Sequence, residues 1–208
     1  MRRVFIAAAL LAAIASATPR VVYTKEFRGS APAWVNIAVE RNGDVVYKEA
    51  PNDEYPLKFK LREEEADDIF RLVDKLERFS HPLESNLKVA NMGLKTFRFE
   101  DGSQTAEVKF NYSLDESARV LADWFERMIE SEQRFIMLER TVKYEKLGVN
   151  DALLQLQISW DRKRLVAVDQ YLPLLDRVIK NDSYLHMARE RAASLADAFR
   201  KEKPAKAE

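Results

Sequence analysis

The chain of 208 residues contains no cysteine, and this absence excludes several kinds of chemistry. Without a thiol there is no disulfide, no zinc site with cysteine ligands and no cysteine nucleophile. The fold must therefore be stabilised by its hydrophobic core. A chain of this length is long enough to bury one good core or two small ones.

Glycine and histidine are also scarce. The five glycines form none of the patterns G-x-x-x-x-G-K, G-x-G-x-x-G or G-x-S-x-G. The sequence thus lacks the usual phosphate-binding loops and the nucleophile turn of many serine hydrolases. Its two histidines, His81 and His186, do not form the i, i+4 pair of a zinc-binding helix. We therefore expect no metal and no other cofactor.

Neither sign of charge dominates. Lys and Arg together number 34, and Asp and Glu together also number 34. Such a balance gives no overall attraction to nucleic acid or to an anionic membrane, so we expect no nucleic-acid partner. The run Arg162-Lys163-Arg164 directly after Trp160 is a local exception. Beside an aromatic residue it could bind a phosphate or a single strand, but the end of a helix favours cations in any case, so we expect an ordinary helix end.

The first seventeen residues have the three parts of a secretory signal peptide. Arg2-Arg3 precede an uncharged run, and Ala15 and Ala17 form a small-x-small cleavage site. We predict a signal peptide over residues 1–17 and a mature chain that begins at Thr18. Because the apolar run is shorter than the roughly 20 residues of a membrane span, we expect no stable anchor after cleavage. The expected location is periplasmic or extracellular; general secretion and the twin-arginine route both stay open.

Residues 18–113 show the alternation that is typical of antiparallel strands. Asn42-Gly43 separates the alternating run 34–39 from a second β-prone run, which predicts a hairpin. A three-residue loop pairs Ile37 with Tyr47 and keeps one continuous apolar face. A two-residue loop would place Ile37 opposite Lys48, so we expect the longer loop.

A further strand, a helix and a second hairpin complete this region. Residues 57–61 alternate and predict a linking strand, and residues 63–79 carry an apolar stripe at helical spacing. The second hairpin turns at Asp101-Gly102, with Phe97 expected opposite Ala106. The predicted fold class is α+β: an antiparallel sheet of about five strands, built from two hairpins and the linking strand, packed by helices.

Residues 114–200 have helical periodicity almost throughout and predict a helical region packed on the sheet. Ser113 and Glu116 have the spacing of a capping box at the start of this region. Asn150 is expected to cap a later helix, and Asp182 or Ser183 the last one. Residues 201–208 are expected to be a frayed tail.

The segment Gly29–Ile37, followed by Asn42–Tyr47, resembles the start of a family of uncharacterised exported bacterial domains. In those domains G-x-C-P-x-Y precedes alternating Val and Ile, a turn glycine and V-x-Y. Ala31 stands where they often carry Cys, and Trp34 where they carry Tyr. The resemblance therefore implies no redox or disulfide role for this chain, and it implies no particular activity.

Carboxylate catalysis has no sequence signature, because paired acids come from distant parts of a chain. In a chain with 33% charged residues, most acids are expected on solvated faces and in ion pairs between neighbouring helical turns. The candidate acids are Asp67, Asp68, Asp101, Asp115, Asp161 and Asp176.

Tyr23 and Trp34 are the candidate partner-binding residues. Trp34 falls on the sheet face opposite Val35 and Ile37, so it is exposed unless helices cover that face. The sequence predicts an exported, non-enzymatic binding or scaffolding protein whose partner is another envelope or extracellular protein, or a glycan. The alternatives are a carboxylate-dependent hydrolase and an inhibitor or assembly factor of another exported protein.

Overall fold

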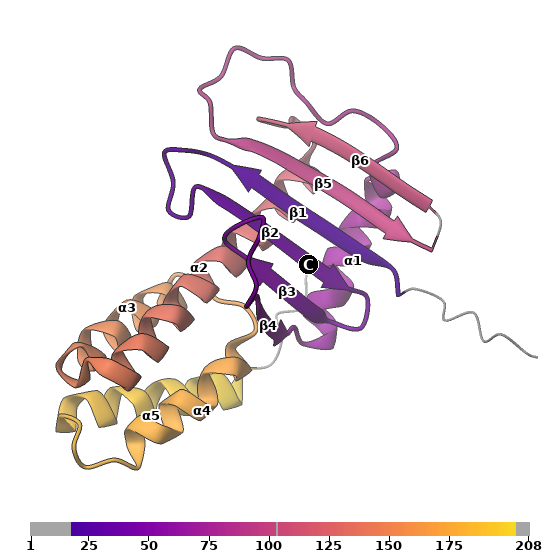
Figure 1. The fold of residues 1–208 in the computed structure, drawn as a ribbon. Helices are drawn as coiled ribbons and strands as arrows, with labels where there is room; N and C mark the ends of the chain where they lie inside the picture. Colours follow the sequence, from indigo (N-terminus) through magenta and orange to yellow (C-terminus); the bar gives the residue numbers. More distant parts are fainter. Residues whose placement is uncertain (1–17, 103, 203–208) are drawn as a thin grey trace, which may run out of the picture.

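The structure is a computed structural model that describes residues 18–102 and 104–202. The predicted signal peptide, with Ala15 and Ala17, lies outside the described residues. In the described part the chain forms one antiparallel sheet and five α-helices, so the predicted α+β class is confirmed (Figure 1). The sheet has six strands in the order β4-β3-β2-β1-β5-β6. They are β1 (Arg20–Glu26), β2 (Trp34–Glu40), β3 (Asp44–Lys48), β4 (Leu57–Lys60), β5 (Leu94–Asp101) and β6 (Gln104–Phe110).

The additional strand is β1, and it lies in the middle of the sheet. It joins the two hairpins, because it pairs with β2 on one side and with β5 on the other. Tyr23 accordingly lies opposite Ile37 in β2 and Phe97 in β5. The run Val21-Val22-Tyr23 has too few alternating residues to reveal a seven-residue central strand.

The β2–β3 hairpin has the predicted register, with Ile37 opposite Tyr47 and Val39 opposite Val45. Gly43 adopts a φ of +88°, a left-handed conformation that side chains disfavour. A Cβ atom at this position would also lie 2.9 Å from the carbonyl oxygen of Leu61. Gly43 is therefore required both by the turn and by the close approach of the chain after β4.

In the β5–β6 hairpin the predicted face is right and the predicted pairing is wrong. Phe97 lies opposite Val108, and Phe99 lies opposite Ala106. The last pair is Asp101 with Gln104, so the turn lies one residue further along the chain than expected. Each β5 residue therefore lies opposite a β6 residue two positions later than expected. Because side chains alternate between the faces with a period of two, the apolar side chains stay on one face.

Helices cover one face of the sheet and leave the other open (Figure 1). The covering helices are α1 (Glu63–Lys75) and the first half of α2 (Glu116–Tyr144). Phe125 of α2 stacks on Tyr23 with ring centroids 4.7 Å apart, and Phe97 contacts both rings. We call the strands, α1 and residues 116–129 of α2 the sheet module, because their buried apolar side chains form one cluster.

The second half of α2 extends beyond the sheet into a group with three further helices; it packs against the first two of them, and the third packs on those two (Figure 1). The three helices are α3 (Val149–Asp161), α4 (Leu172–Ile179) and α5 (His186–Lys201). Together with residues 135–144 of α2 they bury a second apolar cluster, and we call them the helical module. Lys201, the first residue of the predicted frayed tail, is the last residue of α5; residues 203–208 lie outside the described residues.

Several predicted helix caps are wrong. The helix α2 is capped by Asp115, whose carboxylate accepts a hydrogen bond from the Ala118 amide at 3.0 Å, and not by Ser113. No side-chain hydrogen bond caps α3 or α5, which begin at Val149 and His186. Short 3-10 turns or packed loops lead into these helices, so tertiary packing sets their starting points.

The two modules are also joined by a network around Arg62, the residue before α1. Its guanidinium donates to both carboxylate oxygens of Asp169 at 2.8 and 2.9 Å, to Glu202 and to the carbonyl oxygen of Phe199. Glu65 accepts a hydrogen bond from the Ala167 amide at 3.1 Å. A single turn at the start of α1 therefore holds both the segment before α4 and the end of α5.

Candidate functional site

The structure places the two predicted binding residues on opposite faces of the sheet. Tyr23 lies on the helix-covered face and is fully buried, whereas Trp34 lies on the open face and is half-buried. They therefore do not form one patch. Strand pairing explains the difference: Tyr23 lies directly opposite Ile37 and Phe97, and residues that lie opposite each other share a face of the sheet.

Tyr23 has a structural role in the core. Its hydroxyl group donates a hydrogen bond to Glu126 at 2.9 Å, and Lys25 donates to the same carboxylate at 2.8 Å. Burial and the nearby carboxylate raise the pKa of Tyr23 well above its usual range, so the phenol stays protonated. This contact fixes α2 across the sheet and leaves Tyr23 inaccessible to a partner.

Trp34 lines a hollow at one end of the open face. In the strand pairing, Glu26 lies between Trp34 on one side and Leu94 on the other. The hollow has a volume of about 420 Å³, and Phe27 and Arg28 of the β1–β2 turn contribute to its wall. It therefore combines two aromatic rings and an aliphatic side chain with charged groups at its rim.

The β1–β2 turn that carries Phe27 is held by several hydrogen bonds. The Phe27 amide donates to the carbonyl oxygen of Ala33 at 2.8 Å, and the Ser30 hydroxyl donates to the carbonyl oxygens of Phe27 and Pro32. Gly93 packs directly against this turn, and a Cβ atom there would lie 2.7 Å from the Cβ atom of Phe27. Backbone hydrogen bonds and close packing therefore hold this wall of the hollow in place.

Residues 80–93, between the short helix after α1 and strand β5, form the neighbouring part of this surface (Figure 1). Asn111 ties the segment to the end of β6, because its side chain accepts from the Met92 amide at 2.8 Å and donates to the carbonyl oxygen of Ala90 at 3.0 Å. Glu84 accepts from the Asn111 amide at 2.6 Å. The segment has no regular structure, yet hydrogen bonds fix its course.

This anchored segment presents apolar side chains to solvent. Leu87 and Met92 are each 52% exposed, and Val89 and Leu94 are 40% and 44% exposed. Long irregular segments in compact domains are usually either functional or disordered, and this one is held in place. We call the hollow and this segment the sheet-end surface; its apolar members are Phe27, Trp34, Leu87, Val89, Met92 and Leu94.

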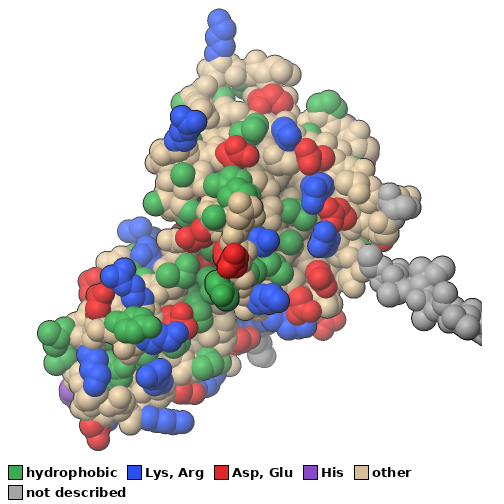
Figure 2. Space-filling view, viewed as in Figure 1, with side chains coloured by type: hydrophobic (Ala, Val, Ile, Leu, Met, Phe, Trp, Pro, Cys, Tyr) green, Lys and Arg blue, Asp and Glu red, His purple; other side chains and the backbone are tan. Residues whose placement is uncertain are grey.

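The rest of the open sheet face has a different character. Figure 2 shows charged side chains of both signs interspersed with small green areas. Arg20 pairs with Glu100 across the sheet, and Arg98 pairs with the same carboxylate at 2.6 Å. Val22, at the centre, is only 7% exposed. The centre of this face, at Val22, therefore exposes almost no apolar surface.

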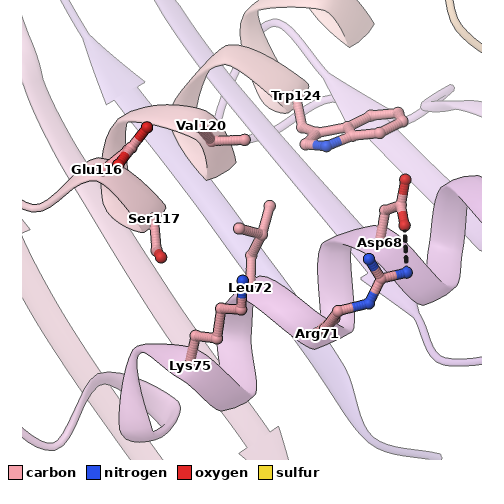
Figure 3. A pocket seen from close by; sticks show the side chains of 8 residues that line it. All are labelled: Asp68, Arg71, Leu72, Lys75, Glu116, Ser117, Val120 and Trp124. Carbon is pink, nitrogen blue, oxygen red and sulfur yellow. Dashed lines mark hydrogen bonds and ion pairs between the residues drawn. The ribbon is translucent and has the colours of Figure 1, made fainter. Parts of the chain in front are cut away.

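A second hollow lies between α1 and α2, on the outer side of the sheet module (Figure 3). Its volume is about 340 Å³, and Leu72, Val120 and Trp124 form its apolar part. Trp124 lies at the edge of the core and carries the Arg127 guanidinium 3.9 Å above its ring. The rim is charged, and two of its side chains pair with each other, since Arg71 binds Asp68 at 2.5 Å.

The candidate acids do not come together at one site. Asp67 pairs with Arg41, Asp176 pairs with Arg200, and Asp115 caps α2. Asp101 ends β5, and Asp161 ends α3. The two histidines lie beside acids of their own segments, His81 near Glu77 and His186 near Glu190. Within residues 18–102 and 104–202, no group of three potential metal ligands is found.

The sequence reasoning missed one buried acid, Glu132, and one half-buried acid, Glu65. Glu132 is 1% exposed and accepts a hydrogen bond from Gln170 at 2.8 Å; burial raises its pKa to about 7. Burial also raises the pKa of Glu65, despite two backbone donors. The signal for Glu132 was its place in the apolar stripe of α2, where it follows Phe125 and Met128 at helical spacing. Neither acid lines the two hollows described above.

Comparison of the chain with protein-family models, with curated proteins and with solved structures finds no match. The resemblance of residues 29–47 to exported bacterial domains thus stays a prediction. Among the described residues, no helix has both the length and the apolar character that crossing a bilayer requires.

Proposed function

We propose that this protein is an exported, non-enzymatic binding or scaffolding module and that it binds its partner through the sheet-end surface. The observation that carries the proposal is the concentration of exposed apolar side chains on an irregular segment that hydrogen bonds hold in place. Exposing large apolar side chains is unfavourable in water, so a contiguous group of them usually marks an interaction site.

The geometry also favours tight recognition. Asn111 and Glu84 fix the backbone of residues 84–92, so little conformational entropy remains to be lost when a partner binds. Trp34 and Met92 belong to residue types that are enriched in protein interfaces. Arg28 and Glu26 at the rim supply polar contacts around the apolar centre. This arrangement of an apolar centre and a charged rim is typical of protein interfaces.

We infer that the partner is another envelope or extracellular protein. The hollow of about 420 Å³ can accept a large side chain from such a partner, with Trp34 and Phe27 as its walls. A glycan stacked on Trp34 is the other possible occupant, and it is distinguished by the experiment below. The hydrolase alternative has less support, because the acids Glu65 and Glu132 line neither hollow.

Site-specific photo-crosslinking in the exporting host tests the proposal. A photoreactive residue replaces Met92 at the sheet-end surface or, as the control, Leu147, which is 86% exposed in the helical module. We expect a discrete protein adduct from position 92, its loss when Trp34→Ala is added, and no such adduct from position 147. Equal labelling at both positions would contradict the proposal. Binding to a glycan array that depends on Trp34 would replace the protein partner with a glycan.

The export part of the proposal has its own test. Intact mass and N-terminal sequencing of the protein from its native type of host should give a mature chain that starts at Thr18. A chain that keeps Met1 and stays in the cytoplasm would refute export, whatever the crosslinking shows.

A further inference from the structure

A third cavity lies where the sheet module meets the helical module. Its volume is about 540 Å³, which is within the size range of small-molecule sites. It is bounded by Arg127 of α2, by the end of α3 with the residues after it, and by the end of α5. Its location and residues are separate from the sheet-end surface.

One side of this cavity is apolar and rigid. Trp160 forms part of the wall, and its ring packs edge-on against Phe199 with centroids 4.9 Å apart. Leu165 and Ala198 continue the wall. Because Phe199 is fully buried and holds Trp160 from behind, the indole presents a fixed surface on which a flat ring can pack.

Three cationic side chains surround the same cavity. They are Arg127, Lys163 and Lys201. Two acidic side chains, Asp161 and Glu202, also line the cavity. Glu202 is engaged by Arg62 at 3.1 Å. Lys163 and Lys201 form no ion pair with any of the described residues, so their ammonium groups can bind a ligand. The run Arg162-Lys163-Arg164 is divided by the fold: Arg164 turns to Asp123 and Glu130, whereas Lys163 borders the cavity.

Arg127 is the buried member of this cationic group. Its Nε atom is buried and has no hydrogen-bond acceptor among the described residues. Asp123 lies 3.3 Å from that atom, but the same carboxylate binds Arg164 more closely, at 2.6 Å. Burial lowers the pKa of Arg127, because removing a charge from water is unfavourable. A negative charge in the cavity would offset this cost.

We propose that this cavity binds a small organic anion with an aromatic ring, the ring against Trp160 and the acidic group toward Lys163, Lys201 and Arg127. The apolar wall and the cations lie on the same cavity, and such a combination suits neither a purely apolar ligand nor a bare inorganic ion. The proposal is independent of the proposed function, since it uses none of the residues of the sheet-end surface.

Equilibrium titration of the mature chain with 1-anilinonaphthalene-8-sulfonate tests the proposal, with the uncharged N-phenyl-1-naphthylamine as the matched probe. The double variant Lys163→Gln/Lys201→Gln removes the two exposed cations, and Lys48→Gln/Lys58→Gln removes the same charge from the open sheet face. We expect the first variant to weaken binding of the sulfonate about fivefold, because each exposed ion pair contributes a few-fold, and to leave the uncharged probe unaffected. The second variant should change neither affinity.

Energy transfer from tryptophan to the probe locates the bound molecule. If the probe lies in the cavity, Trp160→Phe should lower the transfer more than Trp34→Phe does, with Trp124, beside Arg127, accounting for much of what remains. The proposal fails if the uncharged probe binds as tightly as the sulfonate, if both double variants weaken binding equally, or if Trp34 is the main donor. All variants change exposed or half-buried side chains, and circular dichroism confirms that each has the wild-type fold before titration.

Discussion

The sheet module and the helical module bury their cores in different ways. In the sheet module, rings stack on rings: Phe97 contacts Tyr23, Phe79, Phe110 and Phe125, with centroid distances between 5.0 and 5.9 Å. In the helical module rings also contact one another, as Trp160 and Phe199 do, and two tyrosine hydroxyl groups donate to backbone carbonyl groups of α2. Strand pairing fixes the arrangement of the sheet module, whereas the helices have no such pairing, and these hydrogen bonds restrict how they can move.

Three contacts in and beside the helical module illustrate this difference. The Tyr171 hydroxyl donates to the carbonyl oxygen of Ser131 at 2.6 Å, and the Tyr184 hydroxyl donates to that of Val142 at 3.0 Å. The Ser131 hydroxyl accepts from the Val166 amide at 3.0 Å. An apolar stripe alone allows helices to rotate or slide, whereas a buried hydrogen bond is lost if they do.

The largest expected effect comes from removing a central ring. Phe97→Ala should lower the free energy of unfolding by about 4 kcal/mol, because it leaves a cavity among four fixed rings. Phe199→Ala should cost less, about 3 kcal/mol, because its neighbour Trp160 borders a cavity and can shift. Urea denaturation measures both values. Equal losses would mean that the two cores are equally tightly packed.

The next effect concerns the buried acid of α2. The folded-state pKa of Glu132, about 7, is above the unfolded value of 4.5, so the folded protein holds this proton more tightly. Stability is therefore fullest below pH 4.5, falls as the pH rises toward 7 and levels off above it, a change of about 3 kcal/mol at most for this group.

Glu132→Gln tests this sign, because the amide oxygen can still accept from Gln170. At pH 8 the variant should be about 2 kcal/mol more stable than the wild type, and near pH 4 the two should be equal. Denaturation curves recorded at several pH values give the difference. A variant that is less stable at pH 8 would show that the charged form of Glu132 is stabilised in the fold.

A smaller effect is expected at the start of α2. Asp115→Ala removes the acceptor of the Ala118 amide and should lower the unfolding free energy by about 1 kcal/mol. Ser113→Ala, the matched control, removes the residue that the sequence pattern favoured as the cap and should cost less. Both values come from thermal unfolding followed by circular dichroism. A larger loss of stability from Ser113→Ala than from Asp115→Ala would indicate that Ser113 caps the helix, as the sequence pattern predicts.

The smallest effect is a gain in the helical module. Leu185, the residue before α5, is 53% exposed and makes no side-chain cap. Leu185→Asp should raise stability by about 0.5 kcal/mol, since it supplies an acceptor for the first amides and a negative charge at the positive end of the helix. Introducing Asp at His186, one residue later, is the control and should give a smaller gain. No gain from Leu185→Asp would mean that its backbone cannot present the carboxylate to those amides.

Much of the sheet could be predicted from sequence, because strand alternation reports which side is buried. Ile37 and Tyr47 pair as expected for this reason. The length and central place of β1 were not predicted, since its run of three apolar residues does not alternate. Tyr23 was for this reason grouped with Trp34, although the two side chains lie on opposite faces of the sheet. Which strands join the two hairpins depends on contacts between distant segments, and no local pattern contains that information.

The helix ends and the cavities were less predictable. Asn150, Asp182 and Ser183 have the right chemistry for capping, but packing starts the helices at Val149 and His186. The position of Trp34 on the open face was predictable, because alternation places it opposite the buried residues of its strand. The exposed side chains of residues 80–93 were missed, since an irregular segment has no period from which exposure can be read.

The 29 residues of α2 have a consequence for how the chain matures. A helix of this length measures roughly 43 Å and contributes to both cores. When the chain emerges with its N-terminus first, from a ribosome or a translocation pore, strands β1 to β6 and α1 appear before α2, which completes the cover of the sheet. Tyr23 and Phe97 remain without Phe125 until α2 arrives. The strands are thus made first, but the core of the sheet module is complete only after α2 has been added. Until then the part of the sheet face that α2 covers stays exposed, and a chaperone can bind there.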